Sequence, residues 1–166
     1  MSKRRKSGGP TYAIDSSTWI ALEERPDLDM VWATFTVLIK ERRLITSPEI
    51  LKELRHPDYK DTSAIYQLIK PFEGDISFRR LRDQQFHDIL GDLHHDFPQL
   101  CRTRHPKKRP ADPYLIATAK RCGFIVVSEE TVQRRPSRKI PHACVGIGVR
   151  CYTVDELLAK EKTLFT

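Results

Sequence analysis

Four acidic residues follow apolar segments along the chain and could act together in catalysis. Asp15 comes directly after a short apolar run typical of a strand, and Glu130 stands just past another. Glu53 lies on a predicted helix after a second such run, and Asp112 stands at the start of another helix. The carboxyl ends of parallel strands meet at one edge of a sheet, so we expect the four side chains to converge there. Clustered carboxylates repel one another unless a cation lies among them, and oxygen ligands suit Mg²⁺ or Mn²⁺.

Each acid also has an ordinary structural interpretation. Asp112 precedes Pro113 and is typical of a helix N-cap, while Glu53 could be a plain helix acid. Glu129 and Glu130 could form a solvated turn, and either could be the fourth acid. The hydroxyls of two serines at strand ends could orient a metal-bound water or cap a helix; they are Ser16 and Ser128.

The segment from residue 111 to 130 positions two of these acids. Apolar residues recur at helical spacing up to Cys122, which we expect to be a small buried hydrophobe. Gly123 then separates this helix from residues 124–127, a β-branched run typical of a strand buried on both faces.

The remaining elements alternate between short apolar strands and amphipathic helices. We predict strands at residues 11–14, 44–46 and 149–152. Helices are expected at residues 19–25, 30–42, 48–54, 61–69, 79–97 and 154–160, with a turn or short helix at 140–146. This order predicts an α/β fold with a mostly parallel sheet covered by helices.

Length and composition indicate one soluble domain. The 166 residues would form a basic, flexible tail at 1–10 and a single domain at 11–166. Apolar runs are too short for a membrane helix, and the basic start lacks the apolar segment of a signal peptide, so we expect a cytoplasmic protein with no membrane partner.

The net charge of +7 favours a polyanionic partner. Two basic loops flank the acids and could form a phosphate-binding rim, although such loops are usually only solvated. Tyr114 could stack a base there or could be a boundary tyrosine. The candidate nucleic-acid-binding residues are Arg102, Arg104, Lys107, Lys108 and Arg109 in the first loop, and Arg134, Arg135, Arg138 and Lys139 in the second.

Other possible metal ligands have weaker patterns. The four cysteines form no closely spaced pair and are interpreted as reduced thiols, with Cys144, Cys151 and His142 as an alternative metal site. Residues 92–96 contain two aspartates and two histidines, but adjacent residues on a helix point apart, which favours an exposed polar face.

Four motifs resemble, in order and spacing, those of PIN domains, a family of metal-dependent nucleases that includes many toxins of toxin–antitoxin pairs. The motifs are Y-A-I-D-S-S at 12–17, S-P-E-I-L-K-E-L at 47–54, A-D-P-Y-L-I-A-T-A at 111–119 and I-V-V-S-E-E at 125–130. The segments at 139–144 and 149–152 look like those of a poorly characterised prokaryotic subfamily.

The resemblance implies a three-layer α/β/α PIN-like fold and a ribonuclease that uses Mg²⁺ or Mn²⁺. It assigns the four family acids to Asp15, Glu53, Asp112 and Glu130, with a glutamate where the family usually has a fourth aspartate. It also implies single-stranded RNA as substrate and an antitoxin protein as partner, and it leaves a homodimer open. The alternatives are a non-catalytic RNA- or protein-binding module and a structure-specific DNA nuclease.

Overall fold

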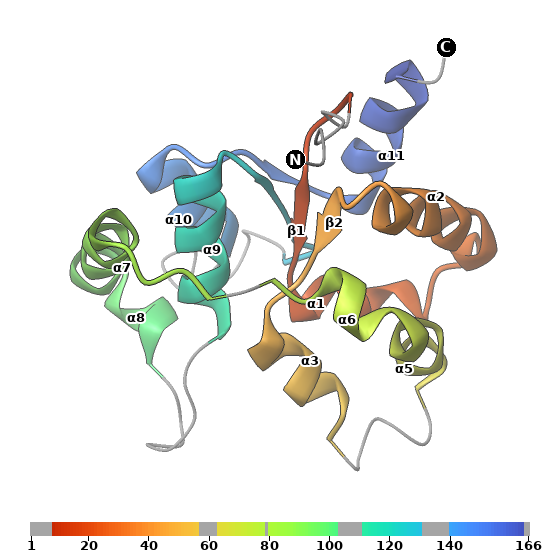
Figure 1. Cartoon of the computed structure of the whole chain (residues 1–166), viewed down its shortest axis with the longest axis horizontal. Helices are drawn as coiled ribbons and strands as arrows, with labels where there is room; N and C mark the ends of the chain where they lie inside the picture. The colour runs from red at the N-terminus through yellow and green to blue at the C-terminus, as the bar shows by residue number, and fades with distance from the viewer. Residues whose placement is uncertain (1–7, 57–62, 79, 103–110, 131–139, 165–166) are drawn as a thin grey trace, which may run out of the picture.

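A sheet of four parallel strands forms the centre of the molecule (Figure 1). The computed structural model describes residues 8–56, 63–78, 80–102, 111–130 and 140–164. The strands lie in the order β2-β1-β3-β4, and every pairing between them is parallel. The predicted mostly parallel sheet is therefore confirmed. The strands are β1 (Tyr12–Ile14), β2 (Leu44–Ile45), β3 (Ile125–Val127) and β4 (Cys151–Tyr152).

Helices cover both faces of this sheet, which gives a three-layer α/β/α architecture. In Figure 1, α7 to α10 lie on one side of β1, and α2 and α11 lie on the other. None of the helices in the described segments has both the length and the apolar character needed to cross a membrane. The helices are α1 (Ser16–Leu22), α2 (Leu28–Lys40), α3 (Pro48–Leu54), α5 (Ala64–Ile69), the 3₁₀ turn η1 (Lys70–Phe72), α6 (Glu73–Ile76), α7 (Gln84–Asp96), α8 (Pro98–Cys101), α9 (Ala111–Cys122), α10 (Ile140–Ile147) and α11 (Val154–Leu164).

Local sequence signals set several element boundaries. The Ser47 side chain accepts a hydrogen bond from the backbone N–H of Ile50 at 3.1 Å and caps α3, whose first residue is Pro48. Gly123 has a φ of 73°, a conformation that glycine adopts without strain, and it ends α9. The chain turns there directly into β3, whose three residues are all buried, as expected for a strand covered on both faces.

The predicted start of α7 is wrong. The charged run beginning at residue 79 suggests a helix, but α7 begins only at Gln84. The Asp83 side chain caps α7 there, because it accepts a hydrogen bond from the backbone N–H of Phe86 at 3.0 Å. Ser77 instead forms a parallel bridge with Thr46, just beyond β2. Between this bridge and α7, the described residues 78 and 80–83 therefore form neither helix nor strand.

Three further expectations fail or fall partly outside the described residues. Asp112 is not an N-cap, because α9 already includes Ala111. Cys122 is exposed rather than buried. The helix expected from residue 61 begins at Ala64, capped by Ser63, and residues 57–62 lie outside the described part of the chain.

A buried ion pair ties the sheet to α11. Arg43 and Glu161 are both almost fully buried, and two guanidinium nitrogens of Arg43 donate to the Glu161 carboxylate at 2.5 and 3.0 Å. The Tyr12 hydroxyl also donates to Glu161, at 2.6 Å. Glu41 also accepts a hydrogen bond from the Arg43 guanidinium, but the Glu41 side chain is 41% exposed. Removal of Glu161 would leave a buried arginine charge with only a solvent-exposed partner.

We expect Glu161→Gln to lower the free energy of unfolding by about 3 kcal/mol, because it leaves the Arg43 charge largely uncompensated in the protein interior. Glu41→Gln removes the exposed partner of the same arginine and should cost less than about 1 kcal/mol. Urea denaturation of both variants measures the difference. Equal losses for the two variants would contradict the interpretation.

Candidate functional site

Asp15 joins the ends of two neighbouring strands at the carboxyl edge of the sheet. It directly follows β1, is fully buried and caps α1, where its Oδ1 accepts from the backbone N–H of Thr18 at 2.8 Å. Its Oδ2 accepts from the hydroxyls of Ser17 and Ser128, each at 2.7 Å. Ser128 directly follows β3, so this bond connects the ends of β1 and β3.

Ser128 thus supplies a supporting hydroxyl, as the sequence predicts. The second hydroxyl that donates to Asp15 belongs to Ser17, whereas Ser16 was the predicted residue. Ser16 is the half-buried first residue of α1. A serine two residues after an N-cap aspartate was the available signal for this contact, because side chains at this spacing commonly bond locally. Three hydrogen bonds stabilise the charged form of Asp15, but burial has the larger effect and raises its pKa.

Asp112 lies in the first turn of α9 and is electrostatically coupled to the other three acids. The pKa of its carboxyl is raised to about 7, first by burial and then, in that order of importance, by the negative charges of Asp15, Glu130 and Glu53. Charges act on one another strongly only at short range in a protein. The structure therefore brings the four predicted acids into one neighbourhood at the carboxyl edge of the sheet.

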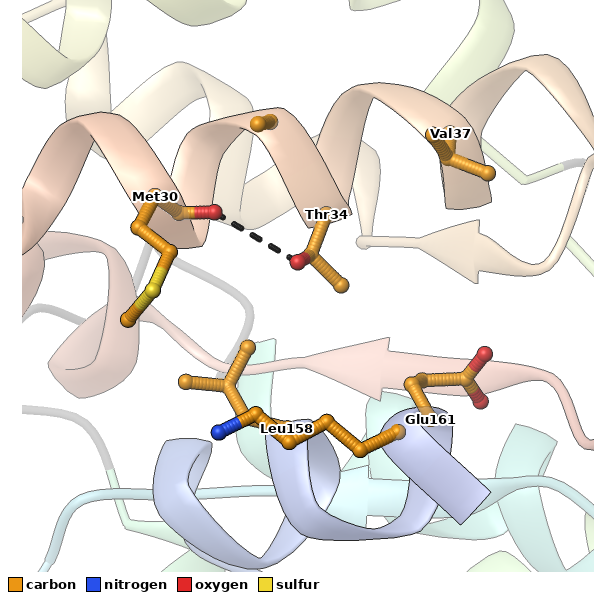
Figure 2. Close-up of a pocket in the computed structure, with 7 residues that line it drawn as sticks. Met30, Thr34, Val37, Leu158 and Glu161 are labelled. Carbon is orange, nitrogen blue, oxygen red and sulfur yellow. Dashed lines mark hydrogen bonds between the residues drawn. The ribbon is translucent and has the colours of Figure 1, made fainter. Parts of the chain in front are cut away.

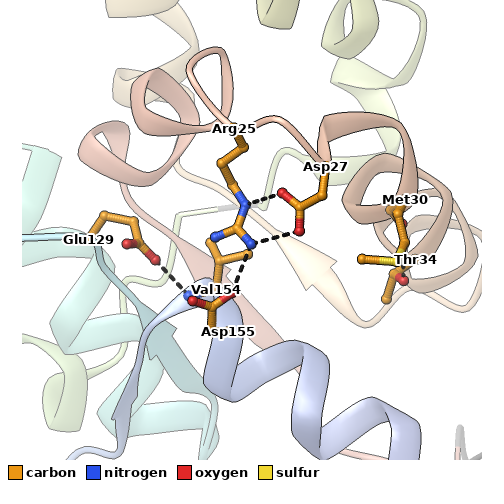
Figure 3. Close-up of polar contacts among 7 residues, drawn as sticks. All are labelled: Arg25, Asp27, Met30, Thr34, Glu129, Val154 and Asp155. Atoms are coloured by element: carbon orange, nitrogen blue, oxygen red, sulfur yellow. Dashed lines mark hydrogen bonds and ion pairs between the residues drawn. The ribbon is translucent and has the colours of Figure 1, made fainter.

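The two adjacent glutamates after β3 have different roles in the fold. Glu130 Oε2 accepts from the backbone N–H of Ile140, the first residue of α10, at 2.8 Å, and the Glu130 charge acts on Asp112. Glu129 Oε1 accepts from the backbone N–H of Val154, the first residue of α11, at 2.6 Å (Figure 3). Glu130, and not Glu129, is therefore the fourth member of the acid cluster, which we define as Asp15, Glu53, Asp112 and Glu130.

Glu53 occupies the edge of the acid cluster. It is an exposed residue near the end of α3, and its charge is the smallest of the causes that raise the pKa of Asp112. Its neighbours Ile50, Leu51 and Leu54 are buried, and they hold the helix against the core. Glu53 is therefore the most exposed of the four acids.

Two thiols also lie near the acid cluster, which the sequence did not indicate. The pKa of Cys144 is raised by a hydrogen bond with Cys151, by burial and by the charges of Asp15 and Glu130. Burial and the charge of Asp112 raise the pKa of Cys101 to about 11. Both thiols are therefore neutral near pH 7. Because Cys144 belongs to α10 and Cys101 to α8, these two helices lie close to the acids.

Across the described residues, no three carboxylate, imidazole or thiol side chains are arranged closely enough to hold a metal ion. This applies to the acid cluster and to the alternative site at Cys144, Cys151 and His142. The His142 ring packs edge-on against Phe97, with 5.6 Å between ring centres. On α7, the residue pair His95 and Asp96 is exposed and joined at 2.7 Å, in agreement with the polar-face interpretation.

The predicted nucleic-acid-binding residues are placed only in part. Arg102 is exposed after α8, whereas Arg104, Lys107, Lys108, Arg109, Arg134, Arg135, Arg138 and Lys139 lie outside the described residues. Tyr114 is a half-buried boundary residue whose ring stacks on Phe86 at 6.2 Å between centres. This packing favours the boundary interpretation over a free base-stacking surface.

A separate apolar cavity of about 550 Å³ lies between α2 and α11. Figure 2 shows Met30, Thr34 and Val37 of α2 facing Leu158 and Glu161 of α11 across it. None of the acid-cluster residues lines this cavity. Its apolar walls offer few groups for chemistry, so the acid cluster is the stronger candidate site.

The raised pKa of Asp112 predicts a pH-dependent stability of the metal-free protein. The ordinary pKa of an aspartate carboxyl is 3.8. Between about pH 4 and pH 7 the folded chain therefore keeps a proton on Asp112 that the unfolded chain releases, so the free energy of unfolding falls as pH rises. Asp112→Asn removes the titrating carboxyl and therefore this loss of stability at higher pH. Because Asp112 is partly exposed, we expect the variant to be more stable by about 1–3 kcal/mol at pH 8, with no difference near pH 4.

Urea denaturation in a chelator at both pH values measures this effect. The matched control is Glu129→Gln, which removes a neighbouring carboxylate that caps α11 and lies outside the acid cluster. That variant should be no more stable than wild type at pH 8. An Asp112→Asn variant that is no more stable than wild type at pH 8 would show that the acid cluster carries no repulsion.

Comparison with known proteins assigns the chain to a family without assigning an activity. No curated protein is detectably similar to it. A family model described as "Domain of unknown function (DUF4411)" matches residues 12–165, which include all four strands and the whole acid cluster. The chain therefore belongs to the DUF4411 family.

Proposed function

We propose that this protein is a metal-dependent endoribonuclease that hydrolyses phosphodiester bonds at the acid cluster. The observation that carries the proposal is the position of Asp112, whose pKa is raised to about 7 by burial and by the charges of the three other carboxylates. Perturbed carboxylates gathered at the carboxyl edge of a parallel sheet are more common at functional sites than elsewhere. The PIN-domain resemblance of the same four segments adds the reaction class.

The donor set of the acid cluster fits a hard divalent cation, Mg²⁺ or Mn²⁺. Asp15, Asp112 and Glu53 supply carboxylate oxygens from three different elements, and a cation would relieve their mutual repulsion. When bound, such an ion lowers the pKa of a water molecule and stabilises the leaving oxygen of a phosphodiester. The ion is thus a natural counterpart of the charges that the chain places here.

The surrounding residues prepare the acids for this role. Ser17 and Ser128 donate to the same oxygen of Asp15 and fix its orientation. Glu130, one oxygen of which is bound to the N-terminus of α10, contributes negative charge beside Asp112. We assign Glu130 a supporting role in catalysis, since its carboxylate already has a structural hydrogen bond.

RNA is the proposed substrate class, with DNA as the alternative that a substrate panel separates. The net charge of +7 supports a polyanion, and the PIN-domain resemblance supports single-stranded RNA. The same resemblance supports a role as the toxin of a type II toxin–antitoxin pair, with an antitoxin protein as partner.

A non-catalytic binding module is the second candidate, and specific contacts favour it. Both oxygens of Asp15 accept hydrogen bonds, and Glu130 caps α10. The acids of the described chain are also not arranged as a preformed metal site. In this alternative the carboxylates only organise the ends of β1, β3 and α10, and the substitutions that follow distinguish the two functions.

We expect Asp15→Asn and Asp112→Asn to reduce RNA cleavage at least about 100-fold while the fold stays intact, because each removes a charge needed to bind the cation. Glu130→Gln should cause a smaller loss. The assay uses Mn²⁺ and a panel of single-stranded RNA, structured RNA and single-stranded DNA. Glu129→Gln is the matched control and should cleave like wild type, because Glu129 caps α11 instead of facing Asp112. Equal cleavage by wild type and Asp112→Asn would refute the enzyme proposal.

The toxin role predicts an effect in cells. Induced expression of the wild-type protein should arrest growth, since cleavage of cellular RNA stops protein synthesis, and expression of Asp112→Asn should not. Co-expression of the protein encoded by the neighbouring gene should restore growth. Unimpaired growth with an active wild-type enzyme would reject the toxin role and leave the nuclease proposal in place.

A further inference from the structure

Within the described residues, Arg80 forms no ion pair with a carboxylate. It is half-buried, its guanidinium lies over the ring of Tyr114 at 3.8 Å from the ring centre, and its Nη2 is enclosed without a hydrogen-bond partner in the described structure. Four other arginines of the described chain differ in this respect. A carboxylate lies within 3.0 Å of the guanidinium of Arg25, Arg43, Arg55 and Arg121.

An enclosed and unpaired guanidinium N–H group costs free energy, because water has been removed and no acceptor replaces it. Stacking on an aromatic ring compensates for part of this cost but satisfies none of the N–H donors. In native proteins nearly all buried donors have an acceptor, either in the protein or in a bound water or ion. The missing group must be an acceptor, and an anion best matches the guanidinium charge.

The segment that precedes Arg80 pairs with the chain just beyond β2, at the edge of the sheet where β2 ends. The Thr46–Ser77 bridge is parallel, and Thr46 directly follows β2, so the chain continues from Ser77 beyond the carboxyl edge. The backbone N–H of Thr46 donates to Ile76 O at 2.9 Å and fixes this course. Figure 1 shows the segment between α6 and α7 passing beneath the strands toward the first turn of α9.

Tyr114 links Arg80 to the acid cluster through α9. Tyr114 stands two residues after Asp112 in the first turns of this helix. Its ring is held by Phe86 of α7, with the two rings inclined by only 22°. The guanidinium of Arg80 is therefore fixed relative to the helix that carries Asp112, while the carboxylates themselves would repel a polyanion.

We propose that the guanidinium of Arg80 binds a backbone phosphate of a polynucleotide that lies along the carboxyl edge of the sheet. The planar guanidinium fork suits two phosphate oxygens, and Tyr114 acts as a positioning residue that holds it. The proposal rests on the proposed function for the identity of the polynucleotide. It assigns to Arg80 the capture of a phosphate that neighbours the one at the acid cluster.

Fluorescence anisotropy with a short fluorescein-labelled single-stranded RNA tests this assignment, in Ca²⁺ so that cleavage is suppressed. Arg80→Gln should raise the Kd about tenfold, as expected for loss of a charge-assisted hydrogen bond. It should also reduce the slope of log affinity against log salt by about 0.7, because one phosphate is no longer neutralised. Arg82→Gln is the matched control. Arg82 is an exposed arginine two residues away, and its loss should change the Kd less than about twofold.

Two further variants separate ligand binding from folding. Arg80→Lys keeps the charge but loses the planar stack, so we expect a Kd about threefold weaker than wild type with an unchanged salt slope. Tyr114→Leu removes the stacking surface and should weaken binding similarly. Thermal unfolding of each variant confirms that it is folded. If Arg80→Gln is unfolded, Arg80→Lys decides, and binding equal to wild type would overturn the assignment.

The outcome is distinguishable from failure of the proposed function. Equal Kd values and salt slopes for Arg80→Gln and Arg82→Gln, in a protein that cleaves RNA, would overturn the role of Arg80 and leave the nuclease in place. A wild-type protein that binds RNA through Arg80 but cleaves none would support the assignment and refute the nuclease. A wild-type protein that does not bind this RNA would overturn the assignment. In an active enzyme, Arg80→Gln should raise KM about tenfold with little change in kcat.

Discussion

Electrostatic repulsion among four carboxylates at one edge of a parallel sheet is the constraint on which the site depends. Asp15, Glu130 and Glu53 act on Asp112 strongly enough, together with burial, to raise its pKa to about 7. The fold tolerates the negative charge of the acid cluster because local hydrogen bonds hold members of the cluster in place. Asp15 is bound by two serine hydroxyls and a backbone N–H, and Glu130 is bound at the start of α10. A protein that used Asp15 and Glu130 only as helix caps would have no reason to place Asp112 beside these two carboxylates.

Much of this arrangement could be predicted from local sequence. The β-branched run before Ser128 indicates a fully buried strand, Gly123 marks the turn that leads into it, and Ser47 with the following proline marks the start of α3. These signals depend on residues close together in the chain. The position of each acid relative to a strand end then follows from the parallel topology, which is why the four acids could be selected before their coupling was known.

The unpredicted features depend on contacts between distant segments. The Asp83 cap sets the start of α7, and the segment before it contains the bridge between Ser77 and Thr46, a pairing that helix propensity does not report. The choice of Glu130 over Glu129 depends on where α10 and α11 begin, because each glutamate caps one of them. The stack of Arg80 on Tyr114 requires the packing of α7 against α9, and no pattern in either segment indicates it.

The most direct test of the central claim is proton release when a divalent cation binds to the acid cluster. Near pH 7 a carboxyl with a pKa of about 7 is half protonated, so binding of Mg²⁺ or Mn²⁺ to the metal-free protein should release about half a proton per ion in weak buffer. The account predicts this release for wild type and its loss in Asp112→Asn. Cation binding without proton release, or equal release by the two proteins, would contradict the claim that Asp112 belongs to a cation-binding site in the acid cluster.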